Sequence, residues 1–379
     1  MEMKATNKPT FNHAKIKWPM VKLGEIAEVI SGQSPESKYY NKKGEGLPFY
    51  QGKTEFSDMY LSKPVIWTSK TTKIAQQNDI LMSVRAPVGP VNISTEKICI
   101  GRGLATIQAK NKINMKFLFY FLKSISNQIR GVGGSVFDSI NQKKIKQIKI
   151  PLPPLSEQKR IAEIISTWDQ AIEKLDKLIS AKEKQFKWLL KKLITDQKNN
   201  PKWKKVRLEQ IAYIKKGQQL NRITLSKVGD YPVQNGGVEP SGYTDKWNTK
   251  ENTITISEGG NSCGFVKFND RKFWSGGHCY FLTNVSNKLD KKFLFHYLKN
   301  YEQKIMRLRV GSGLPNIQRK DIKNFLIIYP DLKIQKQVSN VLDHKEIEIK
   351  TLKQLTIKYQ EQKKGLMQQL LTGKIRVWK

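Results

Sequence analysis

The stretch from Pro151 to Thr195, PLPPLSEQKRIAEIISTWDQAIEKLDKLISAKEKQFKWLLKKLIT, decides the fold. From Leu155 onward it contains no Gly or Pro, and apolar residues recur at gaps of four and three, broken only at Lys182. This spacing is typical of the seam of a coiled coil. The seam residues are Ile161, Ile165, Trp168, Ile172, Leu175, Ile179, Phe186, Leu189 and Leu193. We expect one helix of about 40 residues, roughly 60 Å long at about 1.5 Å per residue.

The start of this helix carries recognisable signals. Pro153 and Pro154 end a preceding strand, because proline cannot continue a β-ladder. Ser156 is a candidate N-cap, and Glu157 stands in the first turn, where an acidic group favours the helix dipole.

A second, weaker copy of the seam lies 177 residues further on, between Asp331 and Thr372. Its seam residues are Val338, Leu342, Ile349, Leu352, Tyr359, Leu366 and Leu370. Lys345, Thr356 and Lys363 also fall on this seam, and Gly365 costs about 1 kcal/mol inside a helix. We expect the two helices to form an antiparallel, pseudo-twofold coiled coil. The alternative is that each long helix packs only on its own domain.

Other segments repeat in the same order, so the chain is a tandem duplication. WPMVKLGEIAEVISGQ from Trp18 matches WKKVRLEQIAYIKKGQ from Trp203 at an offset of 185, with seven identities in sixteen positions. KFLFYFLK from Lys116 matches KFLFHYLK from Lys292, and the segments before the two long helices match at an offset of 177. The ends of each half are alike and the middles differ. Two similar scaffolds therefore hold two different surfaces.

Length and charge bound the function. The chain has 379 residues, which predicts two to four folded units. Its 68 Lys and Arg against 32 Asp and Glu give a formal net charge of +36. Such an excess favours nucleic acid as the partner, while acidic proteins and anionic lipid stay open. The two helical stretches hold nine basic with six acidic and eight basic with five acidic residues, so most of the excess lies outside them.

Cysteine usage and hydropathy exclude several classes of protein. Cys99, Cys263 and Cys279 are odd in number and lack paired spacing, so neither a disulfide framework nor a zinc site is expected. No run approaches the roughly 18 to 20 apolar residues of a membrane span. We expect a cytoplasmic protein that binds no metal and no cofactor in this chain.

Between the repeated ends, short apolar runs punctuated by Gly and Pro predict strands joined by loops. Each half is therefore mixed α and β. Loop residues able to contact base edges or phosphates are Gln51, Lys53, Ser83, Arg85, Arg102, Gln234, Asn235, Ser257, Asn261, Arg271 and His278. Asn and Gln can pair with adenine, and Arg with guanine, through two hydrogen bonds each. Singly these are weak signals, because Asn-Gly-Gly at Asn235 is more typical of a turn and a lone His278 of a packed side chain.

Catalytic patterns are missing or misplaced. There is no GxxxxGK[ST] loop and no clear GxGxxG after a strand, so the sequence shows no evident binding site for ATP or adenosylmethionine. Asp331 with Glu348 and Lys350 imitates a metal-dependent nuclease pattern, but Glu348 falls within the second long helix rather than on a sheet. His344 and Glu346 lack the cysteine pair of a zinc deaminase. We expect no catalytic residues.

The chain resembles the DNA specificity subunits of type I restriction-modification enzymes. The resemblance rests on WPMVKLGEIAEVISGQSP and its second copy, on IKIPLPPLSEQKRIAEIIS before the first long helix, and on QQLLTGKIRVW near the end. It implies a non-catalytic subunit with two target recognition domains, each reading half of a bipartite site in double-stranded DNA. It implies that the helices set the spacer and dock two methyltransferase subunits that use adenosylmethionine. Restriction subunits using ATP and Mg²⁺ join in the full complex.

The implied domain order is a tail at 1–17, recognition domains at 18–154 and 197–330, and helical segments at 155–196 and 331–379. Lys333 and Ile334 stand opposite Ser156 and Glu157, which puts symmetric binding of the two methyltransferase copies in question. Two other functions stay open: a single-chain recognition and modification or cleavage enzyme, and a scaffold that binds acidic proteins.

Overall fold

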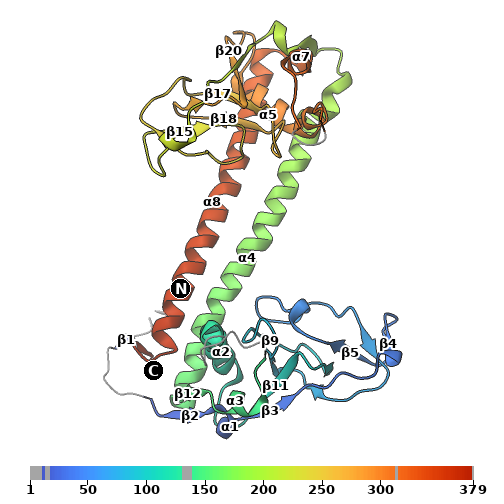
Figure 1. Ribbon diagram of the computed structural model, residues 1–379, viewed down its shortest axis with the longest axis vertical. Coiled ribbons are helices and arrows are strands. Elements are labelled where there is room, and N and C mark those ends of the chain that lie inside the picture. The colour runs from blue at the N-terminus through green and yellow to red at the C-terminus, as the bar shows by residue number, and fades with distance from the viewer. Residues whose placement is uncertain (1–10, 13–17, 130–138, 312–314, 378–379) are drawn as a thin grey trace, which may run out of the picture. The chain divides into compact units, whose positions relative to one another are not determined.

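The computed structural model describes residues 11–12, 18–129, 139–311 and 315–377 (Figure 1). The chain divides into two compact units, one made of residues 1–174 with 356–379 and the other of residues 175–355. Most of the tail expected at 1–17 lies outside the described residues. Within the described ranges no helix is both long and apolar enough to cross a membrane.

The first unit contains a four-stranded antiparallel sheet in the order β3-β11-β8-β9. A five-stranded sheet lies beside it in the order β4-β6-β5-β10-β7, with β5 and β10 parallel. The strands of the first sheet are β3 (Ala27–Ser31), β8 (Ile80–Ser83), β9 (Val91–Ile93) and β11 (Leu104–Ala109). Those of the second are β4 (Tyr40–Asn41), β5 (Leu47–Tyr50), β6 (Trp67–Thr68), β7 (Ile74–Ala75) and β10 (Ile98–Ile100).

The second unit repeats the four-stranded sheet in an equivalent order, β14-β20-β17-β18, beside a smaller sheet, β16-β15-β19. Its strands are β14 (Tyr213–Lys216), β15 (Tyr231–Gln234), β16 (Tyr243–Thr244), β17 (Thr253–Ser257), β18 (Val266–Asn269), β19 (Trp274–Ser275) and β20 (Cys279–Thr283). The predicted mixture of strands and loops is confirmed in both halves.

The repeated openings pair with the strands that precede the long helices. β2 (Met20–Lys22) runs antiparallel to β12 (Lys149–Pro151), and β13 (Lys204–Arg207) runs antiparallel to β21 (Leu326–Tyr329). The first unit has one more pair, β1 (Phe11–Asn12) with β22 (Arg376–Val377). Short helices complete the scaffold: α1 (Leu23–Ile26), α3 (Gln142–Lys146), α6 (Glu302–Met306) and α7 (Arg319–Lys323).

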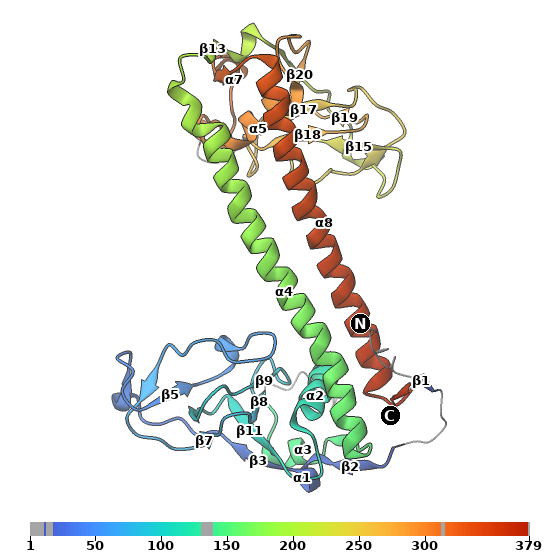
Figure 2. The same cartoon turned by 180° about the vertical axis from the view of Figure 1, so that it is seen from behind.

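The aromatic repeat forms α2 (Met115–Ile129) and α5 (Lys291–Asn300), and each lies between a four-stranded sheet and a long helix (Figures 1 and 2). Asn114 and Asp290 cap these helices by accepting the amide hydrogens of Phe117 and Phe293. Ring contacts with the opening tryptophans are matched as well, at 6.5 Å from Trp18 to Phe117 and 6.1 Å from Trp203 to Phe293.

The two predicted long helices are confirmed as α4 (Leu155–Leu193) and α8 (Leu332–Leu370). Ser156 is not the N-cap, because the helix already begins at Leu155 and Ser156 lies inside the first turn. At the start of α8, Asp331 Oδ1 accepts the amide hydrogen of Ile334 at 3.0 Å and caps the helix.

The helices pair in antiparallel directions. In the second unit Lys182 contacts Glu348 at 2.5 Å and Glu183 contacts Lys353 at 2.6 Å. In the first unit the Trp168 and Tyr359 rings lie 5.3 Å apart and Asp169 pairs with Lys363. Residue numbers rise along α4 while those of their partners fall along α8, which makes the pairing antiparallel. Because the two helices contact each other, the alternative in which each helix packs only on its own domain is wrong.

Burial and ion pairs explain how the seam tolerates its lysines. Every seam residue is buried or half-buried. Glu348 contacts both Lys182 and Lys345, and these contacts lower the pKa of its carboxyl group, with the bond to Lys182 contributing most. The lysines that interrupt the apolar pattern are therefore paired with a carboxylate.

Two buried glutamines, at equivalent positions in α4 and α8, hold each unit together. Gln158 Oε1 accepts the amide hydrogen of Asn114 at 2.7 Å, while its Nε2 donates to the Lys112 and Pro153 carbonyls. Gln335 Oε1 accepts the amide hydrogen of Asp290 at 2.8 Å, and Gln335 Nε2 donates to the Lys288 and Pro330 carbonyls. Each side chain thus joins three backbone groups from the loops before the aromatic and long helices.

Candidate nucleic-acid interface

Three loop segments meet at one junction in the first unit. The amide hydrogen of Gly32, after β3, bonds to the Leu104 carbonyl at 2.9 Å, and that of Gln33 bonds to Ile100 at 3.0 Å. The amide of Gly101, after β10, bonds to the carbonyl of Tyr50 at the end of β5, at 2.8 Å. These bonds place Gln51 and Arg102 beside the end of β3.

The second unit builds the same junction from equivalent residues. Gly217 donates to the Cys279 carbonyl at 2.9 Å, Gln218 to Ser275 at 2.8 Å and Gly276 to Gln234 at 2.8 Å. Asn235 and His278 follow these strands as Gln51 and the Arg102 segment do in the first unit. We call each of these places, residues 32–34, 51 and 101–103 or 217–219, 235 and 276–278, a recognition junction.

Close backbone contact explains why glycine stands at both positions of the repeat. A Cβ on Gly32 lies 2.2 Å from the Gly101 carbonyl oxygen, and one on Gly217 lies 2.3 Å from that of Gly276. No side chain fits at such distances. The identities Gly32/Gly217 and Gln33/Gln218 therefore mark the recognition junctions.

The first junction presents polar side chains to solvent. The Ser34 hydroxyl donates to Gln51 Oε1 at 2.8 Å and accepts the amide hydrogen of Arg102 at 3.2 Å. Gln51, Arg102 and the nearby Lys53 are exposed. The guanidinium and the ammonium supply positive charge beside the Gln51 amide.

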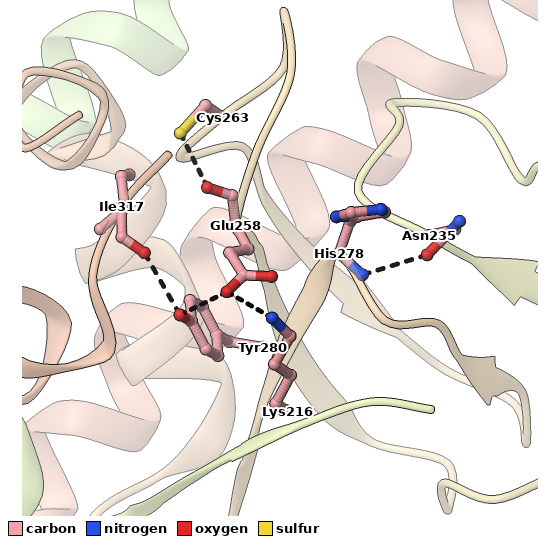
Figure 3. Close-up of polar contacts among 7 residues, drawn as sticks. All are labelled: Lys216, Asn235, Glu258, Cys263, His278, Tyr280 and Ile317. Atoms are coloured by element: carbon pink, nitrogen blue, oxygen red, sulfur yellow. Dashed lines mark hydrogen bonds and ion pairs between the residues drawn. The ribbon is translucent and has the colours of Figure 1, made fainter. Parts of the chain in front are cut away.

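The second junction has different polar groups on the same backbone. Asn235 Oδ1 accepts the amide hydrogen of His278 at 3.1 Å, and the two side chains lie side by side (Figure 3). His278 is exposed, and Asn235 is half-buried with its side chain against Gly276.

A buried carboxylate underlies the second junction. Glu258 Oε1 lies 2.7 Å from Lys216 Nζ and 2.8 Å from the Tyr280 hydroxyl, as Figure 3 shows. Burial and the bond to Glu258 raise the pKa of Tyr280 above its ordinary value. Glu258 Oε2 is buried and has no hydrogen-bond partner within the part of the chain that the structure describes.

The first unit has no carboxylate at the equivalent position. The amide of Glu258 donates to the His278 carbonyl, and the amide of Val84 donates in the same way to Gly103, both at 2.9 Å. Val84 is buried and apolar. The polar core beneath the junction therefore distinguishes the second unit from the first.

Three of the eleven candidate contact residues are placed differently from the expectation, because their side chains are buried and bonded internally. Ser83 donates to the Arg85 carbonyl at 3.2 Å, and Ser257 to the Gly236 carbonyl at 2.6 Å. Gln234 Oε1 accepts from Lys267 Nζ at 3.2 Å. These side chains hold the loops in place and do not face solvent.

The remaining candidates are exposed but lie outside the recognition junctions. Arg85 follows β8 and pairs through its backbone with Ser139. Asn261 lies in the loop between β17 and β18, and Arg271 in the loop between β18 and β19. Exposure leaves all three free to contact a phosphate or a base edge.

One group of possible metal ligands lies in the described residues, His296, Asp343 and Glu346, with donor atoms within 4.8 Å of one another. His296 is buried and its Nε2 lies 2.7 Å from Asp343 Oδ1, while Lys292 Nζ lies 3.7 Å from Asp343 Oδ2. An ammonium group already neutralises this carboxylate. The contact joins α5 to α8, as the bond from Tyr120 to Asp169 joins α2 to α4.

Sequence reasoning missed Ser34, the Glu258 group and the two buried glutamines. The signal for the junctions was present in the repeated Gly-Gln pair, since repeat identities outside an apolar pattern point to a backbone constraint. The buried glutamines carry no such signal, because Gln is ordinary on the solvent face of a helix.

Comparisons with known proteins agree with this architecture. The family model described as "Type I restriction modification DNA specificity domain" matches residues 15–183 and again 200–359. A Methanocaldococcus jannaschii protein named for the specificity subunit of the type I restriction enzyme MjaX is 44% identical over 209 residues, covering 52% of this chain and 49% of that protein. This chain thus aligns with about half the length of that relative.

Other matches extend over most of the chain. The type I restriction enzyme MjaVIII specificity subunit of the same organism is 28% identical over 406 aligned residues, 95% of this chain and 93% of that protein. The crystal structure of a type I restriction-modification S subunit from M. genitalium matches with a TM-score of 0.70 and 19% identity, covering 97% of this chain and 98% of that one. A chain from a structural study of complex assembly in the type I R-M system matches at 0.60. With two family matches that together span most of its length, the chain belongs to the type I restriction modification DNA specificity domain family.

Proposed function

We propose that this chain is the DNA specificity subunit of a type I restriction-modification complex. The observation that carries the proposal is one recognition junction built twice, with Gln51 and Arg102 in one copy and Asn235 and His278 in the other. Equal backbones with unequal polar groups suit two readers of different half-sites. The target recognition domains are residues 18–154 and 197–330.

Phosphate contacts supply the affinity. The net charge of +36 is concentrated outside the long helices, and Lys53, Arg85 and Arg271 are exposed on loops. Contacts of this kind release counterions from DNA, so affinity falls steeply as salt is added. A scaffold for acidic proteins shows no preference for a split DNA sequence, so that preference distinguishes the two functions.

The paired helices set the spacer between half-sites and dock two methyltransferase subunits. Each is 39 residues long, about 58 Å at about 1.5 Å per residue. Their first turns differ, because Glu157 is buried in α4 and its counterpart Ile334 is partly exposed in α8. We expect the two methyltransferase copies to bind with unequal affinity.

Chemistry belongs to the partners. The methyltransferase subunits carry adenosylmethionine, and the restriction subunits carry ATP and Mg²⁺, while this chain needs neither and acts in the cytoplasm as a non-catalytic reader. Methyl transfer by the purified chain alone contradicts this division of labour.

Methylation mapping tests the proposal. The full chain is co-expressed with its methyltransferase subunit, and methylated adenines are mapped across a genome. We expect one bipartite sequence with a fixed gap. If no split sequence is methylated, the chain is not a specificity subunit.

A seven-residue insertion in both long helices tests the spacer role, since a whole heptad preserves the seam. The insertion lengthens each helix by about 10 Å at about 1.5 Å per residue, or about three base pairs at about 3.4 Å each. We expect the gap to widen accordingly while both half-sites stay the same. Replacing the same heptad without insertion is the control, and an unchanged gap after insertion refutes the spacer role.

A further inference from the structure

The Asn235 amide has a fixed orientation. Its Oδ1 lies 3.1 Å from the backbone nitrogen of His278, which can only donate a hydrogen bond, so the atom facing it is the oxygen. The side chain is held against Gly276, where a Cβ would lie 2.3 Å from Oδ1. Among the residues that the structure describes, the Nδ2 amino group has no protein partner, so it is the end of the amide left for a ligand.

The same polarity occurs in the first junction. Gln51 Oε1 accepts from the Ser34 hydroxyl, which in turn accepts the amide hydrogen of Arg102. The oxygen of the Gln51 amide is thus engaged within the protein. Both amides have their oxygens bonded internally, and neither amino group has a partner within residues 18–129, 139–311 and 315–377.

The Glu258 carboxylate at the second junction does not offer a ligand a hydrogen-bond acceptor in place of the Asn235 donor. Glu258 is only 4% exposed, and its Oε1 is bonded to Lys216 and Tyr280. Figure 3 shows this carboxylate beside Tyr280 and Lys216, to one side of the Asn235 and His278 pair. An acceptor for the amino group of cytosine or adenine is therefore not supplied by Glu258.

Resting on the proposed function, we propose that Asn235 is a specificity-determining residue that selects a keto base, guanine or thymine, at one position of the second half-site. Guanine presents O6 and N7 in the major groove and thymine presents O4, all of them acceptors. Cytosine N4 and adenine N6 are donors and meet the Nδ2 amino group without a hydrogen bond. Adenine shares the acceptor N7 with guanine, so keto selection requires Nδ2 to face position 6 of the purine. Two-bond pairing with adenine also requires the amide oxygen, and one of its two lone pairs already accepts the amide hydrogen of His278.

The Asn235→Asp variant tests the polarity with the least change in shape. Its carboxylate still accepts the amide hydrogen of His278, but its outer atom changes from donor to acceptor. The full chain carrying this change is co-expressed with its methyltransferase subunit, and methylated sites are mapped. We expect one base of the second half-site to change from guanine or thymine to adenine or cytosine, with roughly ten-fold less methylation of the original sequence. Asn287→Asp adds the same charge beyond the opposite end of β20 and leaves the sequence preference unchanged.

Base analogues give a second test that needs no variant. In duplexes read by the unaltered complex, 2-aminopurine in place of the guanine, or 5-methylpyrimidin-2-one in place of the thymine, removes the keto oxygen. We expect methylation to fall roughly ten-fold, while inosine in place of guanine, which keeps O6, has little effect.

The outcomes separate the two levels of inference. If the unaltered chain directs no bipartite methylation, the proposed function and this inference both fail. If it directs bipartite methylation but Asn235→Asp changes no base preference and the analogues have no effect, the keto selection alone is wrong. The keto selection is also wrong if Asn235→Asp changes the preference only at a position where the unaltered chain reads adenine or cytosine.

Discussion

The two units share their backbone scaffold and differ in their buried charges. Gln158 and Gln335 make the same three bonds, and both recognition junctions close with the same amide pairs. The first unit buries an ion pair, Glu157 with Arg376, where the second has Ile334. The second buries Glu258 where the first has Val84. The shared contacts define the scaffold, and the buried charges show what each copy does separately.

Chain continuity explains the first difference. The second unit is one continuous segment, whereas the first is made of residues 1–174 with 356–379. Residues 356–379 are not continuous in sequence with residues 1–174, so contacts hold the two segments of the first unit together. These contacts include β22 against β1 and the bonds from Arg376 to Glu157. Arg376 bonds to both carboxylate oxygens of Glu157, at 2.7 and 2.8 Å, and its guanidinium lies 5.2 Å from the Trp18 ring centroid.

Removing the Glu157 charge is expected to have the largest effect. Glu157→Gln removes the carboxylate that pairs with the buried Arg376 guanidinium through both of its oxygens, and breaking a buried ion pair costs about 3 to 5 kcal/mol. The loss is confined to the first unit. Hydrogen exchange followed by mass spectrometry on peptides from each unit measures it separately.

Ile334→Gln is the matched control in the second unit. Ile334 is 39% exposed, so we expect a change within about 0.5 kcal/mol. Equal losses in the two units contradict the idea that the non-contiguous unit depends on the ion pair.

Removing the shared glutamines tests the common scaffold. Gln158→Ala and Gln335→Ala each remove the side chain that bonds a part-buried amide hydrogen and two backbone carbonyls, at a cost of about 1 to 3 kcal/mol. We expect the same loss in both units, read by the same exchange measurement. The exposed Gln170 on α4 is the control, and Gln170→Ala changes stability by less than about 0.5 kcal/mol. A loss in one unit only shows that the scaffolds are not equivalent.

Much of the fold was predictable because it depends on repeated local signals. The heptad pattern after Pro153-Pro154 located α4 to within two residues, and the offset of 177 located α8 as closely. Glu157 was interpreted only as a favourable first-turn acid, and the sequence did not show that it is buried. Its partner Arg376 lies 219 positions away, and no local pattern links residues so distant in sequence.

The candidate site was less predictable for a physical reason. Ser83, Gln234 and Ser257 lie in or at the ends of strands that are buried on both faces, so alternation of polar and apolar residues does not indicate exposure. Gln51, Arg102, Asn235 and His278 follow strands that the sequence indicated. The sequence did not show that backbone bonds bring them together in pairs.

The second buried charge is expected to matter less. Glu258→Gln keeps an acceptor for Tyr280 but loses the ion pair with Lys216, whose side chain is 49% exposed and screened by solvent. We expect a loss of about 1 kcal/mol in the second unit. Val84→Ala is not a matched change, so Lys216→Met serves as the comparison. It removes the ion pair but keeps the buried Glu258 carboxylate charged, so it should cost more than Glu258→Gln. A loss of several kcal/mol in Glu258→Gln shows that Glu258, like Glu157, holds its unit together.

The smallest expected effect is a gain in the part of α8 that belongs to the first unit. Gly365 aligns with Trp188 of α4 at the repeat offset of 177. A Cβ added at Gly365 would meet no atom within 4 Å. Gly365→Ala therefore adds no clash and removes backbone freedom from the unfolded chain, so we expect stabilisation by about 0.5 to 1 kcal/mol. Gly373→Ala is the opposite case, because its φ is +72° and its Cβ lies 3.2 Å from the Trp18 ring. Hydrogen exchange in peptides of the first unit should slow in Gly365→Ala and quicken in Gly373→Ala. Faster exchange in Gly365→Ala means that this glycine is needed for the close approach of α4 and α8, and that the weaker seam of α8 is adapted to its partner.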